Sequence, residues 1–152
     1  MKLAEALQER ADINRRLAQL QSRIDNNILV QEGETPAEDP AALIRELDGC
    51  YARLEHLMAA INRTNAATVV DGMTLTELIA RRDALNGRVA AYREIVRMAG
   101  QSAYRARNTE IKIKAAVPAA ELQKQVDLMA KTLRETDNKL QQANWQVELM
   151  EE

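Results

Sequence analysis

Apolar side chains recur along most of this chain at alternating spacings of three and four residues, which places them on one face of an α-helix. In the second such segment the stripe consists of Leu43, Leu47, Cys50, Leu54, Leu57 and Ile61. In the third it consists of Leu75, Leu78, Arg82, Leu85, Val89, Tyr92, Val96 and Ala99. The first and last segments repeat the pattern, so the sequence predicts four long helices, at about residues 2–27, 40–65, 74–100 and 118–148.

Residues that favour helix ends support these boundaries. Asp39 suits the N-cap of the second helix and Pro40 its first turn, where the missing N–H of proline costs nothing. Thr74 and Glu77 have the spacing of a capping box at the start of the third helix, and Gly100 can end that helix.

Three short stretches between the helices have β character, at about residues 28–31, 67–70 and 111–117. The last of them alternates apolar with charged residues, as a strand with one face in water does. We therefore predict a mainly α fold, in which four long helices form a bundle with a small three-stranded β element at one end. Asp71-Gly72 would be the turn that leaves the middle strand.

A single sheet of these strands constrains the connections. The first two helices would run toward the sheet and the last two away from it, so the linkers 32–39 and 101–110 must each return along the bundle. About ten extended residues reach roughly 30 Å, which is marginal for helices of this length. If the linkers do not reach, the strands pair between chains and the protein is an obligate oligomer.

Length and composition fit one soluble domain over residues 1–152. The chain has no Phe and 3% aromatic residues, so its core is expected to consist of Leu, Ile, Val, Ala and Met. Charges interrupt each apolar run well before the roughly 18 residues of a membrane span, and the charged N-terminal stretch lacks the pattern of a secretory signal. Because Cys50 is the single cysteine, no internal disulfide can form, and we expect a cytoplasmic protein.

Charge is segregated along the chain, although the net charge is only −2. Residues 25–60 carry eight acidic and two basic side chains, whereas residues 81–114 carry nine basic and three acidic ones. The basic residues of the second segment are Arg81, Arg82, Arg88, Arg93, Arg97, Arg105, Arg107, Lys112 and Lys114. They could contact phosphates, or the acidic helix could lie beside the basic one. We favour the second interpretation and expect no nucleic-acid partner, because helical spacing scatters these arginines around the axis of their helix.

Arg82 is the main anomaly, because it lies on an otherwise apolar stripe. A guanidinium there costs several kcal/mol (order of magnitude) unless carboxylates or carbonyls satisfy it. The predicted topology brings further polar residues to the same end of the bundle, and the resulting cluster comprises Asn26, Asn27, Asn62, Thr64, Asn65, Arg82, Asp83 and Asn86. This cluster would either satisfy helix-end carbonyls and fix the register, or form a pocket for an anion or small ligand.

Residues suited to catalysis or metal binding are few. His56 is the single histidine, whereas hydrolytic zinc sites use two or three and di-iron bundles need two Glu-x-x-His units. Cys50 lies on an apolar seam, which raises the pKa of a thiol and makes it unreactive. No nucleophile elbow, phosphate loop or dinucleotide fingerprint occurs. We expect no enzyme, no cofactor and no metal, and we expect Trp145 to pack in the bundle or against another subunit.

Five phrases, in this order, resemble a family of small bacterial helical proteins of uncharacterised function, some of which are labelled septicolysin. They are LAEAL at 3–7, RIDNNILVQEGE at 23–34, INRTN at 61–65, ARRDAL at 80–85 and ANW at 143–145. The resemblance covers nearly the whole chain and implies a shared architecture, but it supplies no catalytic residues. The label implies a pore-forming toxin. Thiol-activated cytolysins carry a Trp-rich segment around a cysteine, whereas GCYARL around Cys50 contains no tryptophan.

Together these features predict a non-enzymatic helical-bundle protein that associates with itself and acts through an interaction surface, with a protein partner that the sequence does not identify. One alternative is a septicolysin-like cytolytic or membrane-active protein, although we expect no membrane partner. A second alternative is nucleic-acid binding through the basic segment 81–114.

Overall fold

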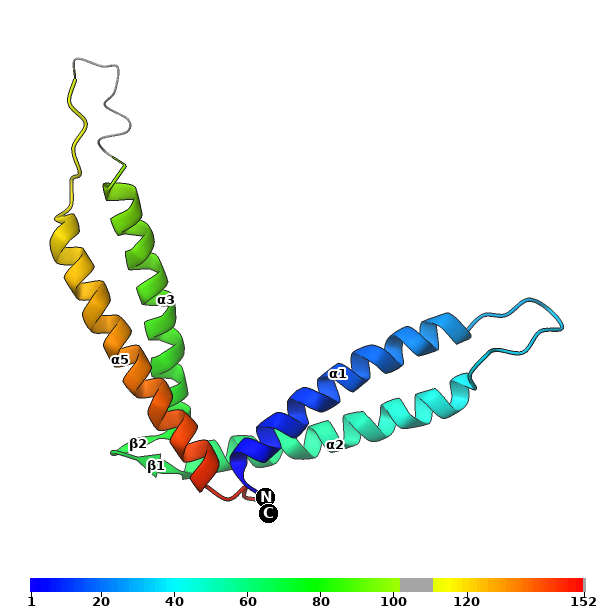
Figure 1. The fold of residues 1–152 in the computed structure, drawn as a ribbon. Coiled ribbons are helices and arrows are strands. Elements are labelled where there is room, and N and C mark those ends of the chain that lie inside the picture. The colour runs from blue at the N-terminus through cyan, green and yellow to red at the C-terminus, as the bar shows by residue number, and fades with distance from the viewer. Residues whose placement is uncertain (102–110, 152) are drawn as a thin grey trace. The chain divides into compact units, whose positions relative to one another are not determined.

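A computed structural model describes residues 1–101 and 111–151 (Figure 1). In these residues the fold is mainly α, with helices α1 (Leu3–Asn27), α2 (Pro40–Ala67), α3 (Leu75–Ala99) and α5 (Ala119–Gln146). The mainly α, four-helix prediction is confirmed, and each helix boundary lies within two residues of its predicted position.

The predicted helix caps explain why the boundaries are sharp. The Asp39 carboxylate accepts a hydrogen bond from the Ala41 N–H at 3.0 Å, with Pro40 in the first turn of α2. At the start of α3 the Thr74 hydroxyl accepts from the Glu77 N–H at 3.2 Å, and the Glu77 carboxylate accepts from the Thr74 N–H at 2.7 Å. The bond from the Thr74 N–H is the main reason that the pKa of Glu77 is lowered.

The β structure of the described residues is a short hairpin of β1 (Val69–Val70) and β2 (Met73–Thr74), paired antiparallel with Val69 opposite Thr74. Both turn residues have positive φ, 51° at Asp71 and 81° at Gly72, which is the conformation that an Asp-Gly turn favours. The turn was predicted correctly. The three-stranded element was wrong, because residues 28–31 and 111–117 form no strand and β1 pairs with residues that directly follow its turn.

The residues group into two compact units. Unit 1 comprises Met1–Thr68 and Ala143–Glu152. Its helices α1 and α2 lie side by side and antiparallel, joined by residues 28–39 (Figure 1). The linker 32–39 is therefore part of a local turn and does not return along a bundle, contrary to the prediction. The linker 101–110 lies largely outside the described residues.

A buried apolar seam and two ion pairs join α1 to α2, and a third ion pair joins α1 to Glu38, just before α2. Near the loop end the seam contains Leu20, Ile24 and Leu43, with Leu47 and Cys50 packed against them. The ion pairs along its sides are Arg16–Glu46, Arg23–Glu38 and Arg53–Glu9. The acidic residues Glu38 and Glu46 are thus paired with basic residues of α1.

The Arg53–Glu9 pair gives unit 1 a pH-dependent contribution to stability. The Arg53 guanidinium donates to both Glu9 carboxylate oxygens, at 2.7 and 2.9 Å, and these bonds lower the pKa of Glu9 below 4.5. A lowered carboxyl pKa adds stability above the unfolded-state value, and this stability is lost as the pH falls through the folded-state value. We expect urea denaturation to show a steeper loss of stability below pH 4.5 for the natural protein than for Glu9→Gln. Equal slopes would contradict the prediction.

At the end of the α1–α2 hairpin opposite its loop, the first and last residues of unit 1 are hydrogen-bonded to each other. The Leu3 N–H donates to the Val147 carbonyl at 3.0 Å, and the Leu149 N–H donates to the Met1 carbonyl at 2.8 Å. The Glu148 carboxylate pairs with the Lys2 ammonium at 2.6 Å and with the N-terminal ammonium at 3.3 Å. The C-terminal residues are therefore part of this unit's fold.

Unit 2 comprises Val69–Gln142, which contains the β-hairpin, α3 and most of α5. Its buried apolar side chains include Leu75, Leu78 and Val89 of α3 and Val126 and Leu140 of α5. The Lys139 ammonium of α5 pairs with the Asp71 carboxylate of the β-turn at 2.8 Å. The prediction of a single domain over residues 1–152 stays a prediction.

Candidate functional site

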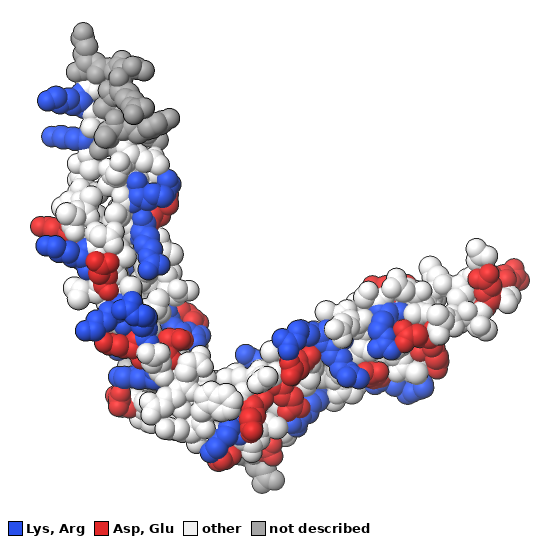
Figure 2. All heavy atoms as spheres, viewed as in Figure 1, with Lys and Arg blue, Asp and Glu red and all other residues white. Residues whose placement is uncertain are grey.

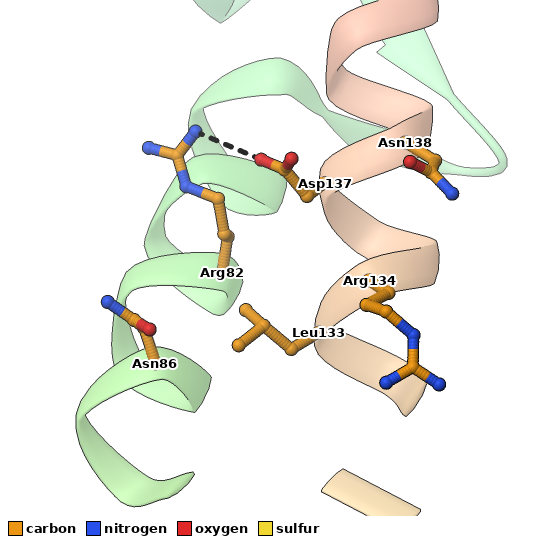
Figure 3. Close-up of a pocket in the computed structure, with 6 residues that line it drawn as sticks. All are labelled: Arg82, Asn86, Leu133, Arg134, Asp137 and Asn138. Carbon is orange, nitrogen blue, oxygen red and sulfur yellow. Dashed lines mark ion pairs between the residues drawn. The ribbon is translucent and has the colours of Figure 1, made fainter. Parts of the chain in front are cut away.

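A polar pocket lies between α3 and α5 of unit 2, with a volume of about 380 Å³. Figure 3 shows the residues that line it, which are Arg82, Asn86, Leu133, Arg134, Asp137 and Asn138. Arg82 and Asn86 lie one helical turn apart on α3, and Leu133 and Asp137 lie one turn apart on α5, so each pair shares a helix face. The pocket is thus formed by two facing polar patches with one leucine between them.

Arg82 has carboxylate partners, as the sequence predicted. Its guanidinium lies 3.0 Å from the Asp83 carboxylate and 3.8 Å from the Asp137 carboxylate across the pocket (Figure 3). The Arg82 side chain is 33% exposed, so water still solvates part of its charge. The cost of placing it on the stripe is correspondingly small.

Asp137 is the functional candidate that the sequence reasoning missed. It lies four residues after Leu133 and three before Leu140, and therefore on the apolar stripe of the last helix. A carboxylate on this stripe is the same kind of anomaly as Arg82 on the stripe of α3. An arginine on one apolar stripe and an aspartate on another were the signal from which their ion pair could have been predicted.

The predicted eight-residue polar cluster does not form as one site, because its unit 1 members lie at opposite ends of the α1–α2 hairpin (Figure 1). Asn26 and Asn27 end α1 at the loop end. Asn62, Thr64 and Asn65 lie near the end of α2, beside the chain termini. This part of the prediction was wrong, because residues 28–31 form no strand that could bring these two ends together. Arg82, Asp83 and Asn86 lie together on α3 in unit 2.

The buried members of the cluster hold backbone in place. The Asn27 amide donates to the Arg23 carbonyl at 2.8 Å and accepts from the Glu38 N–H at 3.0 Å. The Thr64 hydroxyl donates to the Ala60 carbonyl at 2.8 Å and accepts from the Met150 N–H at 2.9 Å. Both residues therefore have the structural role that the sequence analysis weighed against a ligand pocket.

Replacing Arg82 by Leu is expected to change the free energy of unfolding by less than about 1 kcal/mol, because ion pairs that water reaches contribute little. Asp137 is 46% exposed and stays solvated without its partner. Denaturation followed by circular dichroism checks this, with Arg81→Leu on the exposed face as the matched control. A loss of several kcal/mol specific to Arg82 would show that the pair is a buried structural element.

The described residues show no group of three or more His, Cys, Asp or Glu side chains that could hold a metal ion. His56 is exposed on α2, and Cys50 packs beside the buried seam of unit 1. Trp145 is 60% exposed, so the packing predicted for it is not found within the described part of this chain.

The basic segment is partly neutralised within unit 2. Arg82 pairs with the two aspartates described above, and Arg97 donates to the Glu94 carboxylate at 2.8 Å. The Arg88 guanidinium lies 5.4 Å from the ring centre of Tyr92. Arg105 and Arg107 lie outside the described residues. Among the described basic residues of this segment, Arg82 and Arg97 are thus paired with carboxylates, and no ion pair is found for Arg81, Arg88, Arg93, Lys112 or Lys114.

Exposed apolar residues are more prominent than any polar site. Along α2, Ile44, Tyr51 and Met58 are exposed at intervals of seven residues and form a second stripe beside the buried seam. At the loop end of unit 1, the consecutive residues Ile28, Leu29 and Val30 are all exposed, Leu29 at 87%.

The loop end of unit 2 carries an apolar pocket of about 360 Å³, formed by the last turns of α3 and the residues that precede α5. Its lining consists of Glu94, Ile95, Met98, Ala99, Ala115, Ala116 and Val117. Figure 2 shows acidic side chains at the loop end of the α1–α2 hairpin and basic ones near the loop end of the α3–α5 hairpin. Each hairpin thus ends in an apolar surface, with acidic side chains near one and the lysines Lys112 and Lys114 near the other.

Comparisons with known proteins give a family but no activity. The model of a family of unknown function (DUF6847) matches residues 10–149. The crystal structure of a functionally unknown conserved protein from Corynebacterium diphtheriae is similar over 99% of this chain and 99% of that chain, with 38% sequence identity and a TM-score of 0.90. No curated protein matches the sequence.

Proposed function

Because the chain belongs to the family of unknown function DUF6847, its relatives supply no activity, and we propose from its own surfaces that it is a non-enzymatic protein that associates with further copies of itself. Its biological role would then be exerted through the assembled surface. The observation that carries this proposal is the second apolar stripe on α2, formed by Ile44, Tyr51 and Met58.

The stripe supports association because it lies outside the face of α2 that packs on α1. The α2 face toward α1 already contains the buried residues Leu43, Leu57 and Ile61. Ile44, Tyr51 and Met58 are 39%, 55% and 48% exposed, although each is large and apolar. Covering such a stripe with a further helix gains roughly 25 cal/mol for each Å² of apolar surface removed from water. A second copy of the chain offers helices of matching length.

A non-enzymatic role is supported by the chemistry of the polar pocket. The one carboxylate of the lining, Asp137, pairs with Arg82, and the lining contains no Ser, Cys, His or Lys. A cytoplasmic location is supported by the single cysteine, Cys50, which suits a reducing compartment.

No helix among the described residues is apolar over a stretch long enough to cross a bilayer. The septicolysin-like alternative comes from the sequence resemblance. Dye release from liposomes tests it, and our proposal expects no release.

Sedimentation velocity tests the proposal. We expect species heavier than the 17.1 kDa chain, whose share rises with protein concentration. Tyr51→Glu should reduce that share, because a charge in the middle of the stripe must be desolvated on association. Asp48→Glu, on the same helix but conservative in charge, is the control. A strict monomer at about 100 µM, well above the micromolar range typical of weak specific complexes, would contradict self-association.

A further inference from the structure

The loop end of unit 1 is an ordered knob with apolar side chains directed outward. The Asn27 side chain bridges the Arg23 carbonyl and the Glu38 N–H, and Arg23 also pairs with the Glu38 carboxylate. Gly33 has a φ of 86° and lies within a turn that is closed by the Glu34 N–H, which donates to the Gln31 carbonyl at 3.0 Å. These contacts fix the loop while Leu29 stays 87% exposed, so little conformational entropy would be lost when a partner covers it.

The pocket at the loop end of unit 2 is complementary to this knob, because its lining is apolar. Six of its seven lining residues are apolar, and the seventh, Glu94, is paired with Arg97. Its volume of about 360 Å³ is within the range of pockets that enclose small apolar groups. Ile95 and Met98 remain 42% and 44% exposed, so a ligand that filled the pocket would cover them.

The charges around the two loop ends are opposite. The segment from residue 25 to 39 contains no basic residue, and its acidic residues are Asp25, Glu32, Glu34, Glu38 and Asp39. The segment from 111 to 117 contains no acidic residue and two lysines, Lys112 and Lys114, both exposed. Opposite charges around apolar contacts steer association and fix its register.

From these three observations we infer that the apolar knob Ile28–Leu29–Val30 of one copy docks in the apolar end pocket of a second copy, with Glu32 and Glu34 facing Lys112 and Lys114. This inference rests on the proposed self-association and adds to the α2 stripe a second contact, which association also requires. The contact joins two different surfaces, so each copy has one knob and one pocket to offer. An anionic lipid surface is disfavoured as the occupant of the knob, because the acidic residues beside it would be repelled.

Reversing the charges separates loss of the contact from misfolding, because misfolded variants would not regain association when mixed. Glu32→Lys with Glu34→Lys makes the knob side basic, and Lys112→Glu with Lys114→Glu makes the pocket side acidic. Each double variant alone should lose association, because like charges then face each other at the contact. A 1:1 mixture of the two should regain it, because a basic knob then meets an acidic pocket. The natural association should also weaken as salt is added.

Substitution of a single apolar residue of the knob gives a second test of the contact. Leu29→Asp places a charge in the pocket and should raise the dissociation constant by about thirtyfold or more, as loss of a hot-spot contact does. The matched control is Leu128→Asp on α5, which makes the same change at a leucine that is 67% exposed and outside the pocket. It should associate like the natural protein.

Sedimentation velocity separates the outcomes. Loss with Leu29→Asp, retention with Leu128→Asp and recovery in the mixture support the docking contact. Association that survives Leu29→Asp, or a charge-reversed mixture that stays monomeric, overturns the docking contact and leaves the proposed self-association intact. A natural protein that is monomeric at every concentration overturns both.

Discussion

Replacing Leu20 by Ala is expected to lower the free energy of unfolding of unit 1 by about 3 kcal/mol. Leu20 is fully buried in the seam between α1 and α2, where it packs with Ile24, Leu43 and Leu47. Alanine is the best helix former, so α1 itself is not weakened and the loss measures the apolar burial removed together with the cavity left behind. Because whole domains are stable by only about 5–15 kcal/mol, this change should move the unfolding transition visibly.

The chain supplies both a probe and a control for this measurement. Trp145 is its single tryptophan and belongs to unit 1, so its fluorescence reports the unfolding of that unit in urea. Leu128→Ala makes the same change at an exposed site of unit 2 and should shift stability by no more than about 0.5 kcal/mol. Equal effects of the two substitutions would mean that the α1–α2 seam is not the core of unit 1.

The helices could be predicted because their signals are local. The three-and-four spacing identifies the buried face of each helix, and Asp39, Pro40 and the Thr74–Glu77 box mark where helices begin. The β-turn was equally local, since Asp71 and Gly72 adopt positive φ. Its second strand is only Met73–Thr74, too short to show the alternation by which strands are recognised.

Residues 28–30 were predicted wrongly because local sequence patterns do not show which segments pack together. Three consecutive aliphatic residues are typical of a buried strand. In the structure this run directly follows the last turn of α1, and nothing in the sequence shows that it has no partner strand. Whether such a run is buried depends on which elements meet it in space. In this fold it forms the exposed end of a hairpin, which is why an expected strand became a candidate contact surface.

The candidate site was predictable only in part, for a related reason. Arg82 was recognisable as a charge that needs a carboxylate, because it interrupts an apolar stripe. Its partner Asp137 lies 55 residues later in the sequence, and only the pairing of α3 with α5 brings the two together. For Asn27 and Thr64 a structural role was one of two alternatives, and their partners include backbone groups of other segments that no side-chain pattern reveals.

Thr64 should be the most important of these polar residues for stability. Its fully buried hydroxyl donates to the Ala60 carbonyl and accepts from the Met150 N–H, so it ties the C-terminal segment to α2. Thr64→Val keeps the shape but leaves the Met150 N–H without its acceptor, which is expected to cost about 2 kcal/mol. The amides of Leu149 and Met150 should then exchange with solvent faster in hydrogen-exchange measurements, because the segment opens more often.

Thr132→Val is the matched control for this substitution. The Thr132 hydroxyl makes the same kind of bond within its helix, to the Leu128 carbonyl at 3.1 Å, but Thr132 is only half-buried. Its replacement should change stability by no more than about 0.5 kcal/mol and leave exchange at Leu149 and Met150 unaltered. If the two valine variants behaved alike, the helix-internal bond alone would account for Thr64. If only Thr64→Val loosens the C-terminal segment, the bond between Thr64 and Met150 is what holds that segment in unit 1.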